Sequence, residues 1–141
     1  MAVANRIPCC LFVLRVGVFI VMFMWTLDKF VNPDHTAQVY AFFFGIGGLG
    51  ATAFYLIGGL ELLVILTFVA GLFKRFTYGI VLLLHAGSTL AAWRQYLDPF
   101  PNLLFFAAWP MLAACVTLYL LRDRDTLWVI PAGTHASSPK R

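Results

Sequence analysis

The chain has 141 residues, of which 62% are hydrophobic and only 11% are charged. A soluble domain carries about 25% charged residues, so this composition excludes a water-soluble globular protein. The formal net charge of +4 comes from Lys and Arg residues that stand singly or in pairs, and this scatter argues against a basic face for nucleic acid. The composition therefore predicts an integral membrane protein whose first partner is the lipid bilayer.

Four apolar stretches are each long enough to cross a hydrocarbon core of about 30 Å. They lie at about residues 7–27, 51–73, 76–97 and 103–121. We predict an all-α integral membrane protein, a four-transmembrane-helix up-and-down bundle that forms one domain over residues 1–130. A polar cytoplasmic tail follows at residues 131–141.

The connection between the first two spans carries the aromatic run Tyr40–Phe44, which lies between Pro33 and a glycine-rich stretch at residues 45–50. Proline and repeated glycines interrupt helices, so the aromatic run is isolated from both spans. It predicts a short interfacial helix. That helix is either a lid over an opening between spans or an aromatic anchor for the loop.

The flanking cations predict the orientation. Seven of them are expected on one side, namely Arg6, Lys74, Arg75, Arg122, Arg124, Lys140 and Arg141. Lys29 and Arg94 are expected on the other side. The positive-inside rule then places both termini in the cytoplasm.

Three ionisable residues fall inside predicted spans, where a charged side chain is costly and needs a partner. At about 1.5 Å of rise per residue, Arg15, Glu61 and His85 lie roughly 12, 18 and 13 Å from the cytoplasmic ends of their helices. We therefore expect a buried polar layer in which Arg15 pairs with Glu61, with His85 close by, and in which Gly58 lets another backbone approach. The layer either binds a ligand or fixes the registry of the helices.

A second group is expected at the outer face: Trp25, Asp28, His35, Trp93 and Arg94. Tryptophan belongs at membrane interfaces, and Asp28 with Arg94 would form a loop-fixing ion pair. The alternative is the mouth of a head-group or quinone pocket, in which a Trp ring stacks on the ligand and His35 or Asp28 exchanges protons.

The cysteines and histidines of the sequence predict neither a metal site nor a haem site. Cys9, Cys10 and Cys115 have no metal-ligand or C-x-x-C spacing, so we expect three packing residues, no metal site and no dithiol chemistry. His85 is the one deep histidine, which leaves a haem without a second imidazole ligand. An apolar cluster at 127–130 precedes the tail, and we expect a protein subunit to contact it around Trp128.

The segments LRVGVFIVMFMWTLDKFVNP and GGLELLVILTFVAGLFKRFTYGIVLL resemble the DoxX-like family of small four-helix membrane proteins. This family includes DoxD-type subunits of thiosulfate:quinone oxidoreductase. The resemblance covers roughly residues 11–100 and rests on Arg15, the exit at Lys29–Pro33, Glu61, Gly71 and Arg75. It implies a prokaryotic inner (cytoplasmic) membrane location and an association with redox or sulfur metabolism, without a transferable reaction.

Three functional hypotheses follow. In the first, the chain is an accessory or quinone-interacting subunit of a membrane redox complex, with a quinone or lipid as its ligand and no covalently bound cofactor. In the second, it is a structural anchor that assembles partner proteins. The third, a small transporter or proton path, lacks the paired broken helices or inverted repeats of such proteins. No motif predicts a stand-alone enzyme, although the chain could be a subunit of a membrane oxidoreductase.

Overall fold

The computed structural model describes residues 6–130, and every regular element in this range is helical. The elements are α1 (Ile7–Val31), α2 (Pro33–Val39), the π-helical turn η2 (Tyr40–Phe44), α3 (Ala51–Val69), α4 (Lys74–Ala91), α5 (Trp93–Leu97), the 3-10 segment η3 (Phe100–Ala107), α6 (Ala108–Leu120) and the 3-10 turn η4 (Arg122–Arg124). The predicted all-α fold is confirmed for these residues. The predicted polar tail lies outside them.

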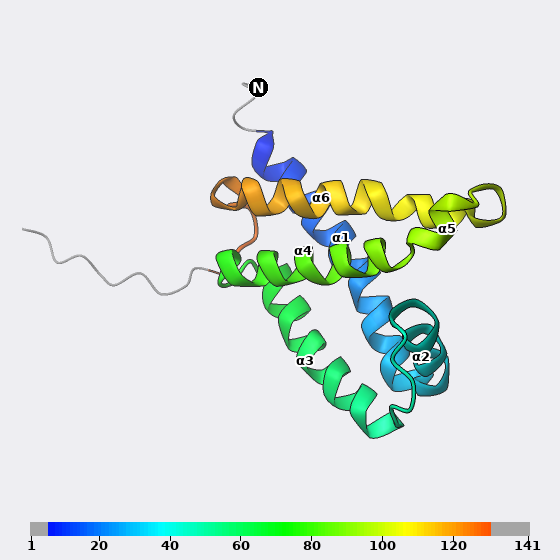
Figure 1. Ribbon diagram of the computed structural model, residues 1–141. Helices are drawn as coiled ribbons and strands as arrows, with labels where there is room; N and C mark the ends of the chain where they lie inside the picture. Colours follow the sequence, from blue (N-terminus) through cyan, green and yellow to red (C-terminus); the bar gives the residue numbers. More distant parts are fainter. Residues whose placement is uncertain (1–5, 131–141) are drawn as a thin grey trace, which may run out of the picture.

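The long helices form two packed pairs. Helix α1 packs along α3 and helix α4 runs beside α6, while α3–α4 and α1–α6 contacts join the pairs (Figure 1). The core lies where the four helices meet, and its buried apolar side chains are Leu11, Val18, Met22, Ile65, Phe68, Tyr78, Val81, Cys115 and Leu118. These side chains come from all four long helices, so the core is one cluster.

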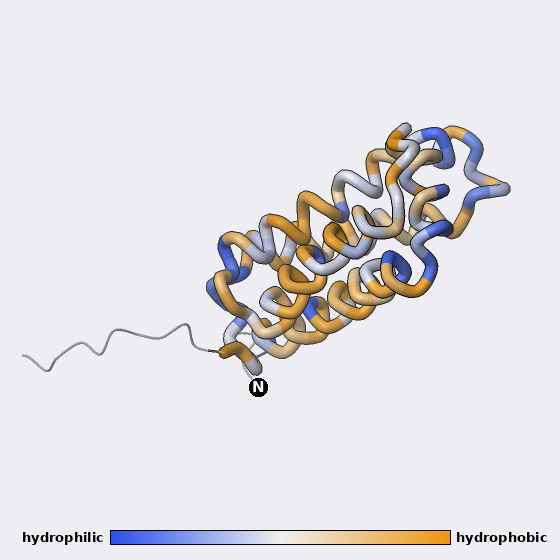
Figure 2. The backbone as a smooth tube through the Cα atoms, turned by 90° about the horizontal axis from the view of Figure 1, so that it is seen from below, coloured by the Kyte–Doolittle hydropathy of each residue, from blue (hydrophilic) through white to orange (hydrophobic). Residues whose placement is uncertain are grey.

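The outer surface is apolar enough to require a membrane. Among the described residues, three helical stretches are long and apolar enough to span a bilayer: Ile7–Val31, Ala51–Val69 and Phe100–Leu120. Hydrophobic residues cover the length of the bundle, and the longest hydrophilic stretches lie in the connections at its ends (Figure 2). The prediction of a membrane protein is therefore supported, with three candidate spans in place of the four expected.

Helix α4 corresponds to the predicted third span but is less apolar than the other three. Its buried side is mostly polar, with Thr77, Tyr78, His85 and Thr89 beside Val81. Its exposed side carries large apolar residues, namely Phe76, Ile80, Leu83, Leu84 and Leu90. It begins at Lys74 and ends at Ala91, so the predicted span at 76–97 is broken near Ala92. The separate short helix α5 follows.

The turn between α3 and α4 is tight because two residues adopt left-handed backbone conformations. Gly71 has φ +69° and Phe73 has φ +46°. This conformation ends α3 at Val69, earlier than the predicted end at residue 73. Lys74 consequently lies in the first turn of α4.

The connection from α1 to α3 is helical over much of its length. Helix α1 ends at Val31, and α2 starts at Pro33. Helix α2 continues into η2, which ends at Phe44 and is followed by Gly45 with φ +68°. A short helix is thus present at Tyr40–Phe44, as part of a longer segment. It folds back beside α1 and α3 (Figure 1).

After α6, residues 122–130 turn back along the end of the bundle, and we call them the C-terminal strap. The amide of Ile130 donates to the carbonyl of Ala70 at 3.0 Å, and Lys74 Nζ donates to the carbonyl of Asp125. The strap is therefore attached to the α3–α4 turn of its own chain.

Candidate functional site

The main candidate site is an ion pair between α1 and α3 that opens onto an apolar groove. Lys29 Nζ lies 2.7 Å from Glu61 Oε2, and the two side chains are 8% and 13% exposed. Lys29 also donates to the carbonyl of Trp25 at 3.2 Å. A lysine ammonium has three protons to donate, so this pair retains donor capacity beyond these two contacts.

A glycine allows α1 and α3 to approach closely at this pair. A Cβ atom on Gly58 would lie 2.9 Å from the Phe30 ring and 3.2 Å from Lys29 Cβ. A larger residue would therefore require the Phe30 ring to shift or the two helices to move apart. The predicted role of Gly58 is confirmed, although the approaching helix brings Lys29 to Glu61 and not Arg15.

Beside the pair lies a groove of about 260 Å³. Its lining is Tyr40, Ile57, Leu60, Glu61, Val64, Ile80 and Leu84, from η2, α3 and α4. Glu61 is the one charged side chain in this lining. A carboxylate in an otherwise apolar pocket with a few polar groups is the usual composition of a small-molecule site.

Tyr40 contributes the second polar group of the groove. Its ring packs edge-on against Phe54 with centroids 5.2 Å apart. Burial raises the pKa of the Tyr40 phenol, and the charge of Glu61 raises it further. The phenol therefore stays protonated and can donate a hydrogen bond at any physiological pH.

A second buried ion pair lies at the other end of α1. Arg15 Nη1 lies 2.9 Å from Asp125 Oδ2, and both side chains are fully buried. Tyr78 donates to the same carboxylate oxygen at 2.6 Å, and Arg15 Nη2 donates to the carbonyls of Leu127 and Trp128 at 2.7 and 3.0 Å. Arg15 thus clamps the C-terminal strap onto the bundle.

The predicted polar layer does not form as expected. Arg15 pairs with Asp125 and Glu61 pairs with Lys29, so the predicted Arg15–Glu61 pair is wrong. Arg15 and Lys29 are 14 residues apart on α1, a separation of roughly 21 Å along the helix. Asp125 of the strap takes the place that Glu61 was expected to have beside Arg15. Helix α1 continues past residue 27 to Val31, so that Lys29 faces α3 and pairs with Glu61.

His85 joins α4 to α6. Its Nε2 atom lies 3.0 Å from the carbonyl oxygen of Ala108 and 3.3 Å from Thr89 Oγ1. Thr89 itself donates back to the His85 carbonyl at 2.7 Å. His85 is therefore buried and hydrogen-bonded, but these hydrogen bonds involve neither Arg15 nor Glu61.

The predicted outer-face residues form two separate groups. Asp28 Oδ2 accepts hydrogen bonds from Thr36 at 3.1 Å and lies 2.6 Å from His35 Nδ1. Arg94 stacks over the Trp93 ring at 5.4 Å from its centroid. The expected pairing of Asp28 with Arg94 is thus replaced by one with His35.

None of these outer residues lines the groove beside Glu61. Trp25 and Trp93 are about half exposed, which suits interfacial side chains.

The cysteines differ from one another. Cys115 is buried in the core as expected, whereas Cys9 and Cys10 are exposed on the first turns of α1, so the expectation that they are packing residues is wrong. Within residues 6–130, no group of three or more His, Cys, Asp or Glu side chains is placed to hold a metal ion.

Comparison of the chain with protein-family models, with curated proteins and with solved structures finds no match. The resemblance to the DoxX-like family therefore stays an expectation based on the residues quoted above.

Sequence reasoning missed four residues of these two sites: Lys29 as the partner of Glu61, Asp125, Tyr78 and Tyr40. Lys29 resembles an interfacial anchor because Trp25 and Asp28 stand beside it. Asp125 resembles a surface charge because it ends the polar run RDRD. One signal was present for Tyr78, which shares a helical stripe with Val81 and His85.

Proposed function

We propose that the chain is a DoxX-like membrane subunit that binds the ring of a quinone in the groove beside Lys29 and Glu61. The observation that supports this proposal most is that Glu61, the carboxylate of the ion pair with Lys29, lines an otherwise apolar groove. A quinone needs apolar walls for its ring and hydrogen-bond donors for its carbonyl oxygens. The groove offers apolar walls and the Tyr40 phenol as a donor. The Lys29 ammonium, bound to the groove-lining Glu61, is a second candidate donor.

The groove is open in the direction that an isoprenoid tail requires. Leu60, Ile80 and Leu84 line it and are 69%, 40% and 43% exposed, so its wall continues into the lipid-facing surface. A tail could leave between α3 and α4 and run directly into the acyl chains.

The chemical role of the site is proton exchange. Reduction of a quinone to a quinol takes up two electrons and two protons, and oxidation releases them. A partner subunit that carries a flavin or a metal centre would exchange the electrons. Glu61 is the group in the groove that can pass protons to and from the quinone oxygen, and its ion pair with Lys29 holds the carboxylate in place.

The same proposal includes α4 as a fourth span. Its exposed face carries Phe76, Leu83 and Leu90, which are 68%, 71% and 63% exposed, and these side chains suit lipid. Its polar side chains lower the mean hydropathy of the helix but face the bundle, where neighbours satisfy them. In this topology η2 lies at the outer interface.

We also propose a prokaryotic inner-membrane location with both termini in the cytoplasm. The cations Lys74, Arg75, Arg122 and Arg124 lie at one end of the bundle, whereas Lys29 at the other end is neutralised by Glu61. This distribution follows the positive-inside rule.

The test uses a double variant that removes the ion pair without leaving one charge buried. Lys29→Met with Glu61→Met substitutes side chains of similar length, a change that is often neutral for folding. In nanodiscs, a photoreactive azidoquinone should crosslink to peptides of α3 and α4 in the wild type and lose most of this crosslinking in the variant. Arg15→Met with Asp125→Leu is the matched control and should crosslink normally. Equal crosslinking by wild type and Lys29/Glu61 variant would refute the quinone site.

A structural anchor is the second candidate, and the Arg15 centre favours it. Arg15 and Asp125 are fully buried and paired, which suits a lock between strap and bundle. If both ion pairs act only in this way, the Lys29/Glu61 variant will change thermal stability or subunit assembly while quinone crosslinking is unchanged.

A further inference from the structure

Cations are concentrated at the end of the bundle that carries the strap. Arg6, Lys74, Arg75, Arg122 and Arg124 form no ion pair among residues 6–130. Asp125 is neutralised by Arg15, which leaves Asp123 as the exposed carboxylate of the strap. This end therefore presents a strongly positive surface at the boundary of the apolar bundle.

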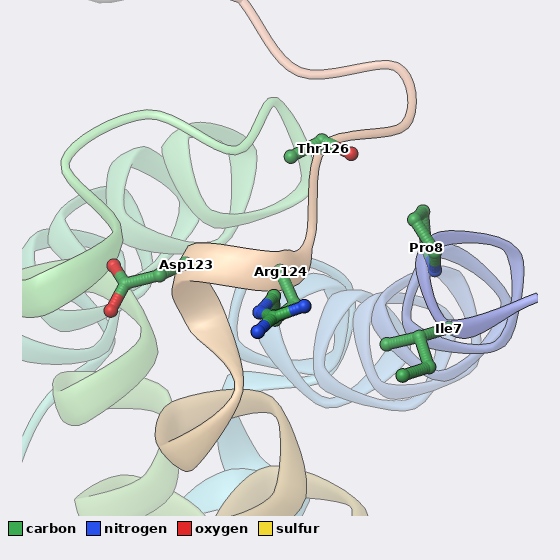
Figure 3. Close-up of a pocket in the computed structure, with 5 residues that line it drawn as sticks. All are labelled: Ile7, Pro8, Asp123, Arg124 and Thr126. Carbon is green, nitrogen blue, oxygen red and sulfur yellow. The ribbon is translucent and has the colours of Figure 1, made fainter. Parts of the chain in front are cut away.

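A cavity of about 210 Å³ lies within this surface, between the strap and the start of α1. Its lining is Ile7, Pro8, Asp123, Arg124 and Thr126 (Figure 3). Figure 3 shows the Asp123 carboxylate directed away from Arg124. The cavity thus combines two apolar side chains, a hydroxyl, the Asp123 carboxylate and a guanidinium that forms no ion pair among residues 6–130.

An exposed tryptophan extends the cavity along α1. Trp128 is 79% exposed and lies 6.4 Å from the Phe12 ring, centroid to centroid, in a stacked arrangement. Phe12 is one helical turn from Pro8, so the two share a face of α1. The cavity and the indole therefore form one continuous surface.

The backbone at Trp128 is strained and is held by hydrogen bonds. Trp128 has φ +52°, a conformation that residues other than glycine rarely adopt. The Arg15 guanidinium fixes it by binding the carbonyls of Leu127 and Trp128. A strained and clamped backbone that presents an exposed side chain points to a binding role for that side chain.

We propose that this surface binds the head group of an anionic phospholipid. The phosphodiester accepts hydrogen bonds from Arg124 and from the Thr126 hydroxyl, and its acyl chains lie along Pro8 and Phe12. The Trp128 ring lies at the level of the head groups, where indoles are enriched. The surrounding cations select a negatively charged lipid over a zwitterionic one.

The test measures the fluorescence of Trp128 in nanodiscs that contain brominated lipids as quenchers. Trp25, Trp93 and Trp109 are replaced by Phe so that one indole remains. At equal mole fraction, brominated phosphatidylglycerol should quench more strongly than brominated phosphatidylcholine. Arg124→Gln should reduce this preference about fivefold, the effect of one cation at an anionic surface.

Three controls make the outcome decisive. Arg94→Gln removes a cation from the other end and should leave the preference unchanged. Inorganic phosphate at matched ionic strength should not displace the lipid; displacement would show a site for free phosphate instead. If the single-tryptophan variant does not fold, the difference in quenching between the wild type and Trp128→Phe gives the same comparison.

Equal quenching by the two lipids would overturn the proposal, because Trp128 would then be an unselective interfacial residue. Absence of quenching by either lipid would also overturn it, because the indole would then be covered by a protein. A preference that Arg124→Gln reduces and Arg94→Gln does not would support it.

Discussion

The two ion pairs of α1 differ in how deeply they are buried and in how many fixed partners they have. Even the Arg15 pair is not fully satisfied, because Arg15 Nε and Asp125 Oδ1 are buried without a hydrogen-bond partner among residues 6–130. Around Arg15 the guanidinium binds a carboxylate, a tyrosine hydroxyl and two carbonyls, and the pair is fully buried. Lys29 binds one carboxylate and one carbonyl and is slightly exposed, and its partner Glu61 lines a groove. A fully buried pair with many fixed partners suits a structural lock, whereas a less deeply buried pair whose carboxylate lines an open groove suits a ligand site.

The largest effect is expected at the Arg15 centre. Arg15→Met leaves Asp125 buried without its cation and releases the two strap carbonyls. Breaking a buried pair in this way costs about 3–5 kcal/mol of unfolding free energy. Thermal or denaturant unfolding in detergent measures the loss, and adding Asp125→Leu should restore most of it. A single variant as stable as the wild type would contradict the proposed lock.

A smaller loss is expected when the Lys29 pair is broken. Glu61→Gln removes the charge partner of Lys29, but the partly exposed ammonium can move toward the groove and recruit water. We expect a cost of about 1–2 kcal/mol, below that of a fully buried pair. Unfolding of Glu61→Gln is measured under the same conditions as that of Arg15→Met. A loss of unfolding free energy as large as that of Arg15→Met would remove the distinction between the two pairs.

Two glycines, one near each pair, compare how tightly the two regions are packed. Gly71 has φ +69°, and a Cβ atom there would lie 2.5 Å from Val129 Cγ1. Gly71→Ala should therefore lower the free energy of unfolding by about 1–2 kcal/mol through backbone strain alone. The clash with Val129 should also loosen the strap.

Gly58→Ala is the matched variant. Its Cβ atom meets the edge of the Phe30 ring at 2.9 Å, which can shift, and alanine favours the helix by about 1 kcal/mol. We expect a net change within about 1 kcal/mol in either direction. Unfolding of Gly71→Ala and Gly58→Ala in the same detergent tests which variant loses more stability. A larger loss of unfolding free energy for Gly58→Ala would contradict the expected order.

The smallest expected effect is a change in the titration of Tyr40. Burial raises the pKa of this phenol, and the Glu61 charge raises it further. Glu61→Gln removes the negative charge, so the phenolate becomes less unfavourable and the pKa of Tyr40 should fall while staying above its ordinary value. The difference in absorbance at alkaline pH between each protein and its Tyr40→Phe variant isolates this group. An unchanged or higher pKa of Tyr40 in Glu61→Gln would show that the Glu61 charge does not act on the Tyr40 phenol.

Parts of this comparison could be predicted from sequence because they depend on local pattern. The cost of a charge in lipid identifies Arg15 and Glu61 as residues that need partners, and both have one. The role of Gly58 as a point of close approach also follows from its position one turn before Glu61.

The identity of the partners could not be predicted, since it depends on where the chain turns back. Asp125 is 110 residues from Arg15 and reaches it only because η4 reverses the chain after α6. Lys29 faces α3 because α1 extends to Val31, beyond the predicted end at residue 27. Both outcomes are set by helix ends, which residue patterns define least well.

The arrangement of side chains on α4 has a consequence for how the protein is made. A segment with Thr, Tyr and His on one side gains little by entering lipid alone, because these groups would meet hydrocarbon before they meet partners. The turn at residues 70–73 joins α4 directly to the more apolar α3. If α4 spans the bilayer as proposed, the two helices should be inserted together as a hairpin, and α6 should then cover the polar side.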